Sequence, residues 1–208
     1  MKFINGVFLL KKTFNKKFNR IVYEIFAGDY FVTDEKDIML STLLGSCVSV
    51  CLKDKVSGIV GMNHFMLPAS VKKEEFIISD DARYGMYAME KMINDMMKLG
   101  ARRSSLKAKV FGGGEVLGTK INSVSKSNIH FAMNYLKMEE IPVLSYDVGG
   151  KVGRKLYFVP ETFDVFIKKI GQEARLAEAV RAEESYLHQI KRSRAQKAKS
   201  ADNLTLFE

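Results

Sequence analysis

The chain has 208 residues, of which 47% are hydrophobic and 27% charged. This composition supports one substantial domain and excludes two large ones. No apolar run approaches the roughly 18 residues of a membrane-crossing helix, and no signal peptide is recognisable, so the sequence predicts a cytoplasmic protein. Cys47 and Cys51 are too few for a disulfide framework and are expected to be reduced.

The formal net charge of +9 is concentrated at the two ends of the chain. Residues 1–23 contain six basic and no acidic residues, and residues 191–199 contain five basic and no acidic residues. The middle of the chain is therefore close to neutral. Two interpretations of the basic ends stay open, namely solvation of the termini and contact with a polyanion. No recognition motif in the domain favours specific nucleic-acid binding.

Strand patterns dominate the first third of the chain. Residues 21–26 have the composition of a first strand. Residues 47–52 alternate with period two, and residues 57–67 form a second extended run that Pro68 stops. The short polar turn at residues 53–55 lies between these two runs, so they predict an antiparallel hairpin.

A polar stretch at residues 72–81 predicts a loop, and a long amphipathic helix is predicted at residues 82–99. Asp80 or Asp81 is a candidate N-cap, and Gly100 is a suitable C-cap. Apolar side chains recur at helical spacing on one face, which indicates core packing rather than a ligand site. These are Met86, Met89, Ile93 and Met96.

The rest of the domain combines one more helix with several strands. The helix is predicted to begin at Ser127 or Asn128 and to end near residue 137. Its apolar side chains recur at helical spacing and are expected to face the core. Strands are predicted at residues 105–111, 141–146, 155–159 and 163–169, the last two as a hairpin.

The character of the chain changes after residue 170. Residues 172–189 are rich in good helix formers and predict a solvated helix, whereas residues 191–203 are predicted to be disordered. Residues 204–207 are largely apolar and either dock on a partner or have no role. The predicted organisation is a basic extension at 1–24, a domain at 25–170, and a helical then disordered tail at 171–208.

Cys47 is the candidate nucleophile. It follows the apolar run 37–44 and the flexible pair Gly45-Ser46, and it begins a predicted strand. A thiol at such a junction can be exposed at the edge of a sheet, with nearby backbone N–H groups free to hold an oxyanion. His64 alone of the three histidines lies in a predicted core strand, one hairpin away, where it can serve as the base.

A third group is needed to orient the imidazole, and Ser41, Thr42 and Asn63 are the candidates. Cys51 lies roughly 13 Å from Cys47 in a regular strand, too far for a disulfide, and is expected to be a buried apolar residue. Glycines 112–114 lack a complete phosphate-binding motif, and no group of residues has metal-ligand spacing. No cofactor or metal is therefore predicted. A Cys–His pair alone supports a hydrolase only weakly.

Two blocks of sequence resemble the motifs of the CheD family of chemoreceptor glutamine deamidases. Residues 40–52 read Leu-Ser-Thr-Leu-Leu-Gly-Ser-Cys-Val-Ser-Val-Cys-Leu, and residues 61–68 read Gly-Met-Asn-His-Phe-Met-Leu-Pro. The resemblance covers about residues 25–170. Further matches are Ala-Arg-Tyr-Gly at 82–85, Phe-Gly-Gly-Gly at 111–114, Gly-Gly at 149–150 and Gly-Arg-Lys at 153–155.

The resemblance implies a fold, a site and a reaction. The fold is α/β, with mixed, sandwich-like β-sheets flanked by helices, similar to the toxin-type cysteine deamidases. The nucleophile falls on Cys47 and the histidine on His64, and the hydroxyl-bearing third residue falls on Ser41 or Thr42, with Ser41 favoured. Cys47 then attacks the side-chain amide of a receptor glutamine, ammonia leaves, and water hydrolyses the thioester to glutamate, which supports chemotaxis adaptation. The implied partners are the cytoplasmic helices of methyl-accepting chemoreceptors and a CheC-type phosphatase.

Three other functions stay open on the sequence. A non-catalytic adaptor that binds chemoreceptors or a phosphatase would not need the Cys47 thiol. A cysteine hydrolase for another amide would act on free glutamine or on a different protein. A nucleic-acid binder would lose affinity steeply with salt and would depend on the basic ends.

Overall fold

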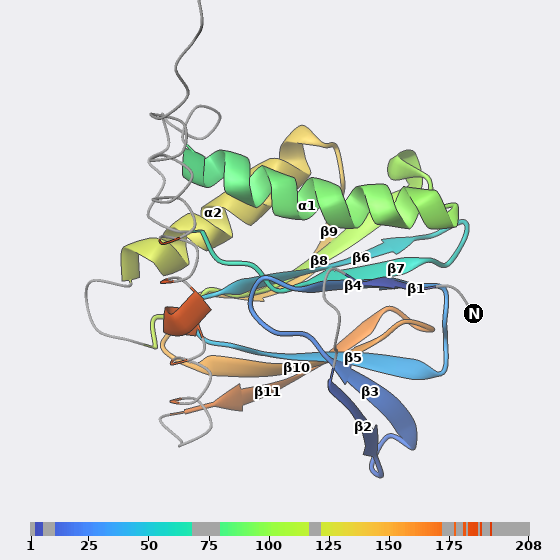
Figure 1. The fold of residues 1–208 in the computed structure, drawn as a ribbon, viewed down its shortest axis with the longest axis horizontal. Coiled ribbons are helices and arrows are strands. Elements are labelled where there is room, and N and C mark those ends of the chain that lie inside the picture. Colours follow the sequence, from blue (N-terminus) through green and yellow to red (C-terminus); the bar gives the residue numbers. More distant parts are fainter. Residues whose placement is uncertain are drawn as a thin grey trace, which may run out of the picture.

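The computed structural model describes residues 3–5, 11–67, 80–116 and 122–171, together with residues 177, 181, 183–186, 188 and 192. Within these residues the chain forms two β-sheets and two long helices, α1 (Asp80–Leu99) and α2 (Asn122–Met138) (Figure 1). No helix in this part of the chain is long and apolar enough to cross a membrane.

Both sheets are mixed. The six-stranded sheet has the order β1 (Phe3–Asn5), β4 (Tyr30–Thr33), β7 (Val60–Asn63), β6 (Val48–Asp54), β8 (Leu106–Gly112) and β9 (Val143–Val148). The five-stranded sheet has the order β11 (Asp164–Ile170), β10 (Gly153–Val159), β5 (Ile38–Leu44), β3 (Arg20–Glu24) and β2 (Lys11–Asn15). The pairs β8–β9 and β3–β5 are parallel, and the other pairs are antiparallel.

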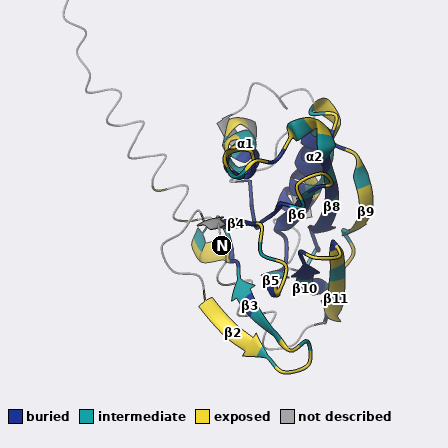
Figure 2. Ribbon diagram, turned by 90° about the vertical axis from the view of Figure 1, so that its right-hand side faces the viewer, coloured by how far each residue is buried: buried dark blue, intermediate teal, exposed yellow. Residues whose placement is uncertain are grey.

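The elements stack as three layers. Figures 1 and 2 show α1 and α2 on one face of the six-stranded sheet and the five-stranded sheet on its other face. One core lies between the helices and the sheet, where Ile93 and Met96 of α1 meet Leu52 and Val110. A second core fills the space between the sheets and includes Leu40, Val60 and Phe158. The predicted mixed α/β class is confirmed.

Several predicted elements are found at the expected places. The β6–β7 hairpin, α1 and the β10–β11 hairpin match the strand and helix patterns of the sequence. Met89, Ile93 and Met96 are fully buried, as the core interpretation of the apolar stripe predicts. The residues of the predicted tail helix that the structure describes, such as Ala177 and Arg181, are helical. The prediction that this helix is solvated was wrong for Glu183, which is buried because its carboxylate bonds to the loop between β5 and β6.

One predicted helix start was wrong, and strand β4 was not predicted. α2 begins at Asn122 rather than at Ser127 or Asn128, because the buried Asn128 side chain bonds to other loops and does not cap the helix. The predicted loop at 72–81, apart from its last two residues, lies outside the described residues, as do the apolar end at 204–207 and the predicted disordered stretch at 191–203 except for Arg192.

The segment expected as a basic extension contributes β2 and β3 to the five-stranded sheet. Val22 of β3 is buried against Met39 and Val159, so this part of the chain adds to a core. β2 is an edge strand whose side chains are almost all exposed (Figure 2). Lysines on an edge strand prevent its pairing with other chains. Because the same lysine-rich composition is typical of a solvated tail, the sequence did not distinguish this strand from an extension.

Candidate active site

Cys47 lies in the tight connection between β5 and β6, directly before the first residue of β6. The glycine turn after β8 holds this connection, because Gly113 N–H donates to the Cys47 carbonyl at 2.7 Å and Gly114 N–H donates to the Gly45 carbonyl at 2.8 Å. Gly112 has a φ of 111°, and a Cβ atom there would lie 2.3 Å from the Cys47 carbonyl oxygen. The glycine run therefore supports the site through its backbone, as a tight turn.

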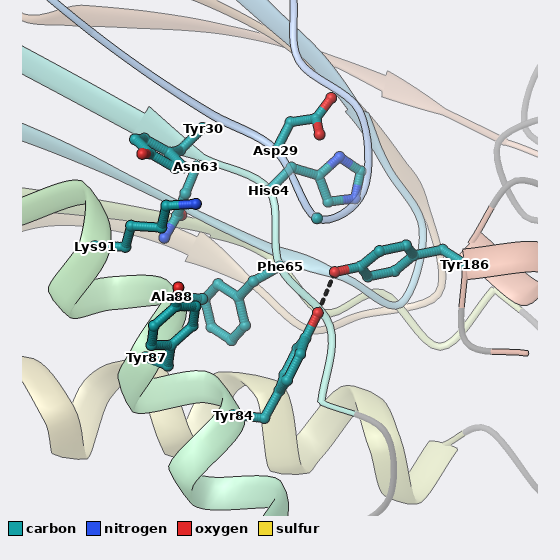
Figure 3. Close-up of a pocket in the computed structure, with 11 residues that line it drawn as sticks. Asp29, Tyr30, Asn63, His64, Phe65, Tyr84, Tyr87, Ala88, Lys91 and Tyr186 are labelled. Atoms are coloured by element: carbon teal, nitrogen blue, oxygen red, sulfur yellow. Dashed lines mark hydrogen bonds between the residues drawn. The ribbon is translucent and has the colours of Figure 1, made fainter. Parts of the chain in front are cut away.

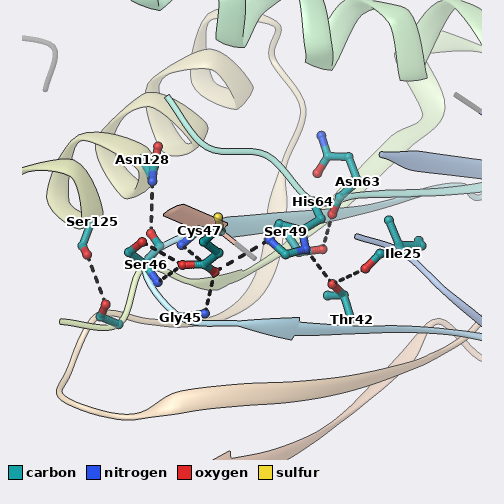
Figure 4. A network of polar contacts seen from close by, with 12 residues as sticks. Ile25, Thr42, Gly45, Ser46, Cys47, Ser49, Asn63, His64, Ser125 and Asn128 are labelled. Atoms are coloured by element: carbon teal, nitrogen blue, oxygen red, sulfur yellow. Dashed lines mark hydrogen bonds and ion pairs between the residues drawn. The ribbon is translucent and has the colours of Figure 1, made fainter. Parts of the chain in front are cut away.

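His64 follows β7 and is held by its backbone. Its N–H donates to the Asp29 carbonyl at 2.9 Å, and its carbonyl accepts from Gly28 N–H at 2.7 Å. The next residue, Phe65, pairs with Val48 in an isolated antiparallel bridge. This pairing brings the Cys47 and His64 side chains together, and both are buried (Figure 4).

Thr42 fixes the His64 ring. The Thr42 hydroxyl lies 2.7 Å from the Ile25 carbonyl and 2.8 Å from His64 Nδ1. A carbonyl only accepts, so the hydroxyl donates its proton to Ile25 and accepts from Nδ1–H. Nδ1 therefore carries a proton in either charge state of the ring. Nε2, which lies 3.8 Å from Glu183 Oε1, holds a lone pair in the neutral ring and an N–H facing the carboxylate in the protonated ring.

The other two candidates for the third group lie elsewhere. Ser41 is next to Thr42 on β5, so its side chain points to the opposite face of the strand. Its hydroxyl is buried and has no hydrogen-bond partner in the described part of the chain. Asn63 accepts a hydrogen bond from Val50 N–H at 2.8 Å. Of the three, Thr42 is the residue that contacts the His64 ring (Figure 4).

Glu183 is part of the site, and sequence reasoning missed it. Its carboxylate accepts hydrogen bonds from the N–H groups of Gly45 at 2.8 Å, Ser46 at 2.9 Å and Cys47 at 3.4 Å, and from the Ser46 hydroxyl at 2.9 Å. The residue is only 2% exposed. It belongs to a stretch rich in Ala, Glu and Arg that has the composition of a solvated helix, so no sequence signal marked it.

The charges in the site favour a protonated thiol. Burial raises the pKa of Cys47 well above its ordinary value, and the charge of Glu183 and its hydrogen bond with the thiol raise it further. Burial alone would raise the pKa of Glu183, but the His64 ring, Gly45 N–H and the thiol together bring it below its ordinary value. The site thus holds a carboxylate beside a neutral thiol.

Cys51 is buried in the core between the sheets, as predicted, and burial raises its pKa to about 12. It is therefore an unreactive thiol at neutral pH.

A pocket opens beside His64. It is lined by the loop at Gly28 and Asp29, by one face of α1, and by Tyr186 (Figure 3). The hydroxyl groups of Tyr84 and Tyr186 form a hydrogen bond across it. Burial raises the pKa of the Asp29 carboxyl to about 6.

Cys47, His64 and Glu183 each offer one ligand atom within 4.8 Å of the others, and they are the group of three that could hold a metal ion among the residues described. Sequence spacing did not indicate this cluster, because Glu183 is distant from both partners in the chain. These donor types suit zinc. However, both Glu183 oxygens already accept hydrogen bonds, and the thiol would first have to lose its proton.

A buried thiol, an imidazole in a fixed tautomer and several converging N–H groups are the parts of a cysteine-hydrolase site. The family model described as "CheD chemotactic sensory transduction" matches residues 66–169. Relatives named "Probable chemoreceptor glutamine deamidase CheD" are 46% identical in Janthinobacterium sp. (strain Marseille), over 76% of this chain and 78% of that protein, and 42% identical in Ralstonia nicotianae, over 93% and 82%. The chain belongs to the CheD family, which confirms the resemblance seen in the sequence.

Similarity to solved structures is weak. The crystal structure of the Bacillus licheniformis hypothetical protein YfiH aligns with a TM-score of 0.38 and 12% identity, over 56% of this chain and 49% of that chain. This level of similarity supports no conclusion about function.

Proposed function

We propose that the protein deamidates glutamine side chains of methyl-accepting chemoreceptors to glutamate, with Cys47 as nucleophile and His64 as general base. The main support is one arrangement, in which the buried thiol and imidazole adjoin the N–H groups of residues 45–47, and these already bind a carboxylate. The names of relatives that align over most of the chain support the choice of substrate.

The geometry supports a two-stage reaction. His64 Nε2 takes the Cys47 proton, and the thiolate attacks the amide carbon of the glutamine side chain. The N–H groups at residues 45–47 hold the developing oxyanion. His64 then gives its proton to the leaving ammonia, and it activates a water molecule that hydrolyses the thioester. Throughout, Thr42 accepts from Nδ1–H and so keeps Nε2 directed into the site.

Substrate binding also helps to form the nucleophile. The Glu183 carboxylate beside Cys47 raises the pKa of the thiol, after the effect of burial itself. A glutamine amide is neutral, so a substrate in the same place removes this negative charge. The thiolate–imidazolium pair then forms more readily.

The other expectations from the sequence remain part of the proposal. The substrate helices lie in the cytoplasm, and a CheC-type phosphatase is a second partner of the family. The relation to toxin-type cysteine deamidases is an expectation from the same resemblance. So is a catalytic domain at 25–170, to which β1, β2 and β3 add strands.

The proposal is tested with the purified protein and a glutamine-bearing cytoplasmic fragment of a chemoreceptor. Deamidation replaces NH₂ by OH, which raises the fragment mass by about one dalton per site. We expect this shift with the wild-type protein and no shift with Cys47→Ala. A folded wild-type protein that binds receptor fragments without any mass shift would favour the adaptor function instead. Release of ammonia from free glutamine would indicate a broader amide hydrolase.

A further inference from the structure

The site is occupied by a side chain of the protein itself. A glutamate side chain is what remains in the active site after a glutamine has been deamidated. Glu183 places such a carboxylate beside Cys47 and His64, within 4.8 Å of both side chains. Its four hydrogen-bond donors include the N–H groups that the proposed reaction assigns to the oxyanion.

We propose that residues 183–186 bind the active site as an intramolecular product analogue, which blocks the site and displays how it recognises a helical substrate. The identity of the substrate in this inference rests on the proposed function. The block itself rests only on the contacts of Glu183 and Tyr186.

The first anchor is the Glu183 side chain, whose fit leaves little spare room. A Cβ atom added at Gly45 would lie 2.9 Å from Glu183 Oε2. The absence of a side chain at this position therefore allows the carboxylate to approach the backbone N–H groups. Hydrogen bonds from several donors to a buried carboxylate are strong, because the acceptor is charged and water is excluded.

The second anchor is Tyr186, which lies three residues further along the same helical stretch. Residues three apart lie on the same side of a helix. The Tyr186 hydroxyl bonds to the Tyr84 hydroxyl of α1 (Figure 3). A Cβ atom added at Gly28 would lie 2.4 Å from the Tyr186 ring. Glu184 and Ser185, between the two anchors, are exposed.

This pattern outlines how a helical substrate is recognised. A helical segment inserts the side chain of residue i beside Cys47 and rests a large side chain of residue i+3 against Gly28 and Tyr84, where Tyr186 forms one wall of the pocket beside His64. We expect substrate glutamines to lie on helices with a large side chain at i+3. We also expect the intramolecular segment to compete with them.

The sharpest test converts the product analogue into a substrate. In the full-length Glu183→Gln variant, Cys47 Sγ bonds to the new amide carbon and the C–N bond breaks as ammonia leaves with a proton from His64. Water then hydrolyses the thioester and restores glutamate at position 183. The purified variant should therefore have the wild-type mass, whereas the double variant with Cys47→Ala should stay about one dalton lighter than the Cys47→Ala single variant. Glu184→Gln is the matched control, because that side chain is exposed and should stay unconverted.

A second measurement tests the block. Against the receptor fragment, Glu183→Ala and Tyr186→Ala should each deamidate faster than wild type, by roughly 5- to 100-fold. Glu184→Ala should match the wild type. Retention of the introduced glutamine at position 183 overturns the product-analogue inference, and an unchanged rate for Glu183→Ala overturns the block. If both of these results are found while the receptor fragment is still deamidated, this inference fails and the proposed function is retained. If no variant deamidates either substrate, the proposed function fails.

Discussion

The Thr42 hydroxyl oxygen lies 2.8 Å from His64 Nδ1, and the same hydroxyl group donates to the Ile25 carbonyl. This pair of contacts determines which ring nitrogen carries the proton, because the hydroxyl has only one proton to give. In the proposed reaction, Thr42 takes the place that a carboxylate occupies in a Ser-His-Asp triad, without adding a negative charge. We infer that Thr42 is a positioning residue that acts through His64.

Replacing Thr42 by Val should lower kcat for receptor deamidation by roughly 100-fold with little change in KM, because the ring loses its fixed tautomer. Thr42→Ser keeps the hydroxyl and should retain most of the activity. Ser41→Ala is the matched control, since the Ser41 hydroxyl is buried and makes no hydrogen bond within the described residues. Its activity should stay within about threefold of wild type. Steady-state kinetics over a pH series would distinguish an altered general base from misfolding. Equal losses of kcat in Thr42→Val and Ser41→Ala would contradict the assignment of Thr42 as the positioning residue.

Gly112 is expected to be essential for both stability and activity. An alanine there must adopt a φ of 111° and would place its Cβ atom 2.3 Å from the Cys47 carbonyl oxygen. Gly112→Ala should lower the free energy of unfolding by about 3 kcal/mol or more and displace Cys47.

Gly58→Ala provides the control for Gly112→Ala. Gly58 has a φ of 79°, but a Cβ atom there would meet nothing within 4 Å. Gly58→Ala measures the cost of the positive φ alone, about 1 kcal/mol in the free energy of unfolding. It should keep full activity. Urea denaturation of both variants measures the difference, and similar losses would show that the contact with Cys47 does not matter.

The sequence predicted those helices and strands in which apolar residues recur with a clear period. The apolar stripe of α1 and the alternation in β6 are local patterns, and both elements were found where expected. β2 was not predicted, because a lysine-bearing edge strand has no buried face to mark it. Asn128 was taken as a helix cap because the residue type suits one, whereas its partners come from loops distant in sequence.

The residues of the candidate site also fall into those that the sequence predicted and those that it did not. The motif around Cys47 and His64 pointed to the pair, and β-strand pairing explains why they meet. The choice between Ser41 and Thr42 depends on which face of β5 points to His64, and the resemblance favoured Ser41 without that information. Glu183 could not be predicted, because its role depends on a tertiary contact between the C-terminal segment and a backbone loop.

The Asp29 carboxyl should make stability fall with rising pH. Burial raises its pKa to about 6, so the folded state holds this proton more tightly than the unfolded state. Its contribution to stability is present below about pH 4 and is lost as the pH rises through about 6. Asp29→Asn should therefore be more stable than wild type at about pH 7.5, by about 1 kcal/mol after allowance for solvent screening, and equal to it near pH 4. Urea denaturation at the two pH values measures this difference, and a constant difference would contradict it.

Asn128 connects the two loops of the site, and its loss should impair catalysis more than folding. Its side-chain amide donates to the Ser46 carbonyl at 3.0 Å, and its oxygen accepts from Leu67 N–H at 2.8 Å. Asn128→Asp keeps the acceptor for Leu67 but loses the donor to Ser46, which frees the loop that carries Cys47. We expect kcat to fall by roughly 10-fold in Asn128→Asp and by more in Asn128→Leu, which loses both bonds. Asn134→Asp on the same helix is the control, and the assignment fails if its kcat falls as far as that of Asn128→Asp.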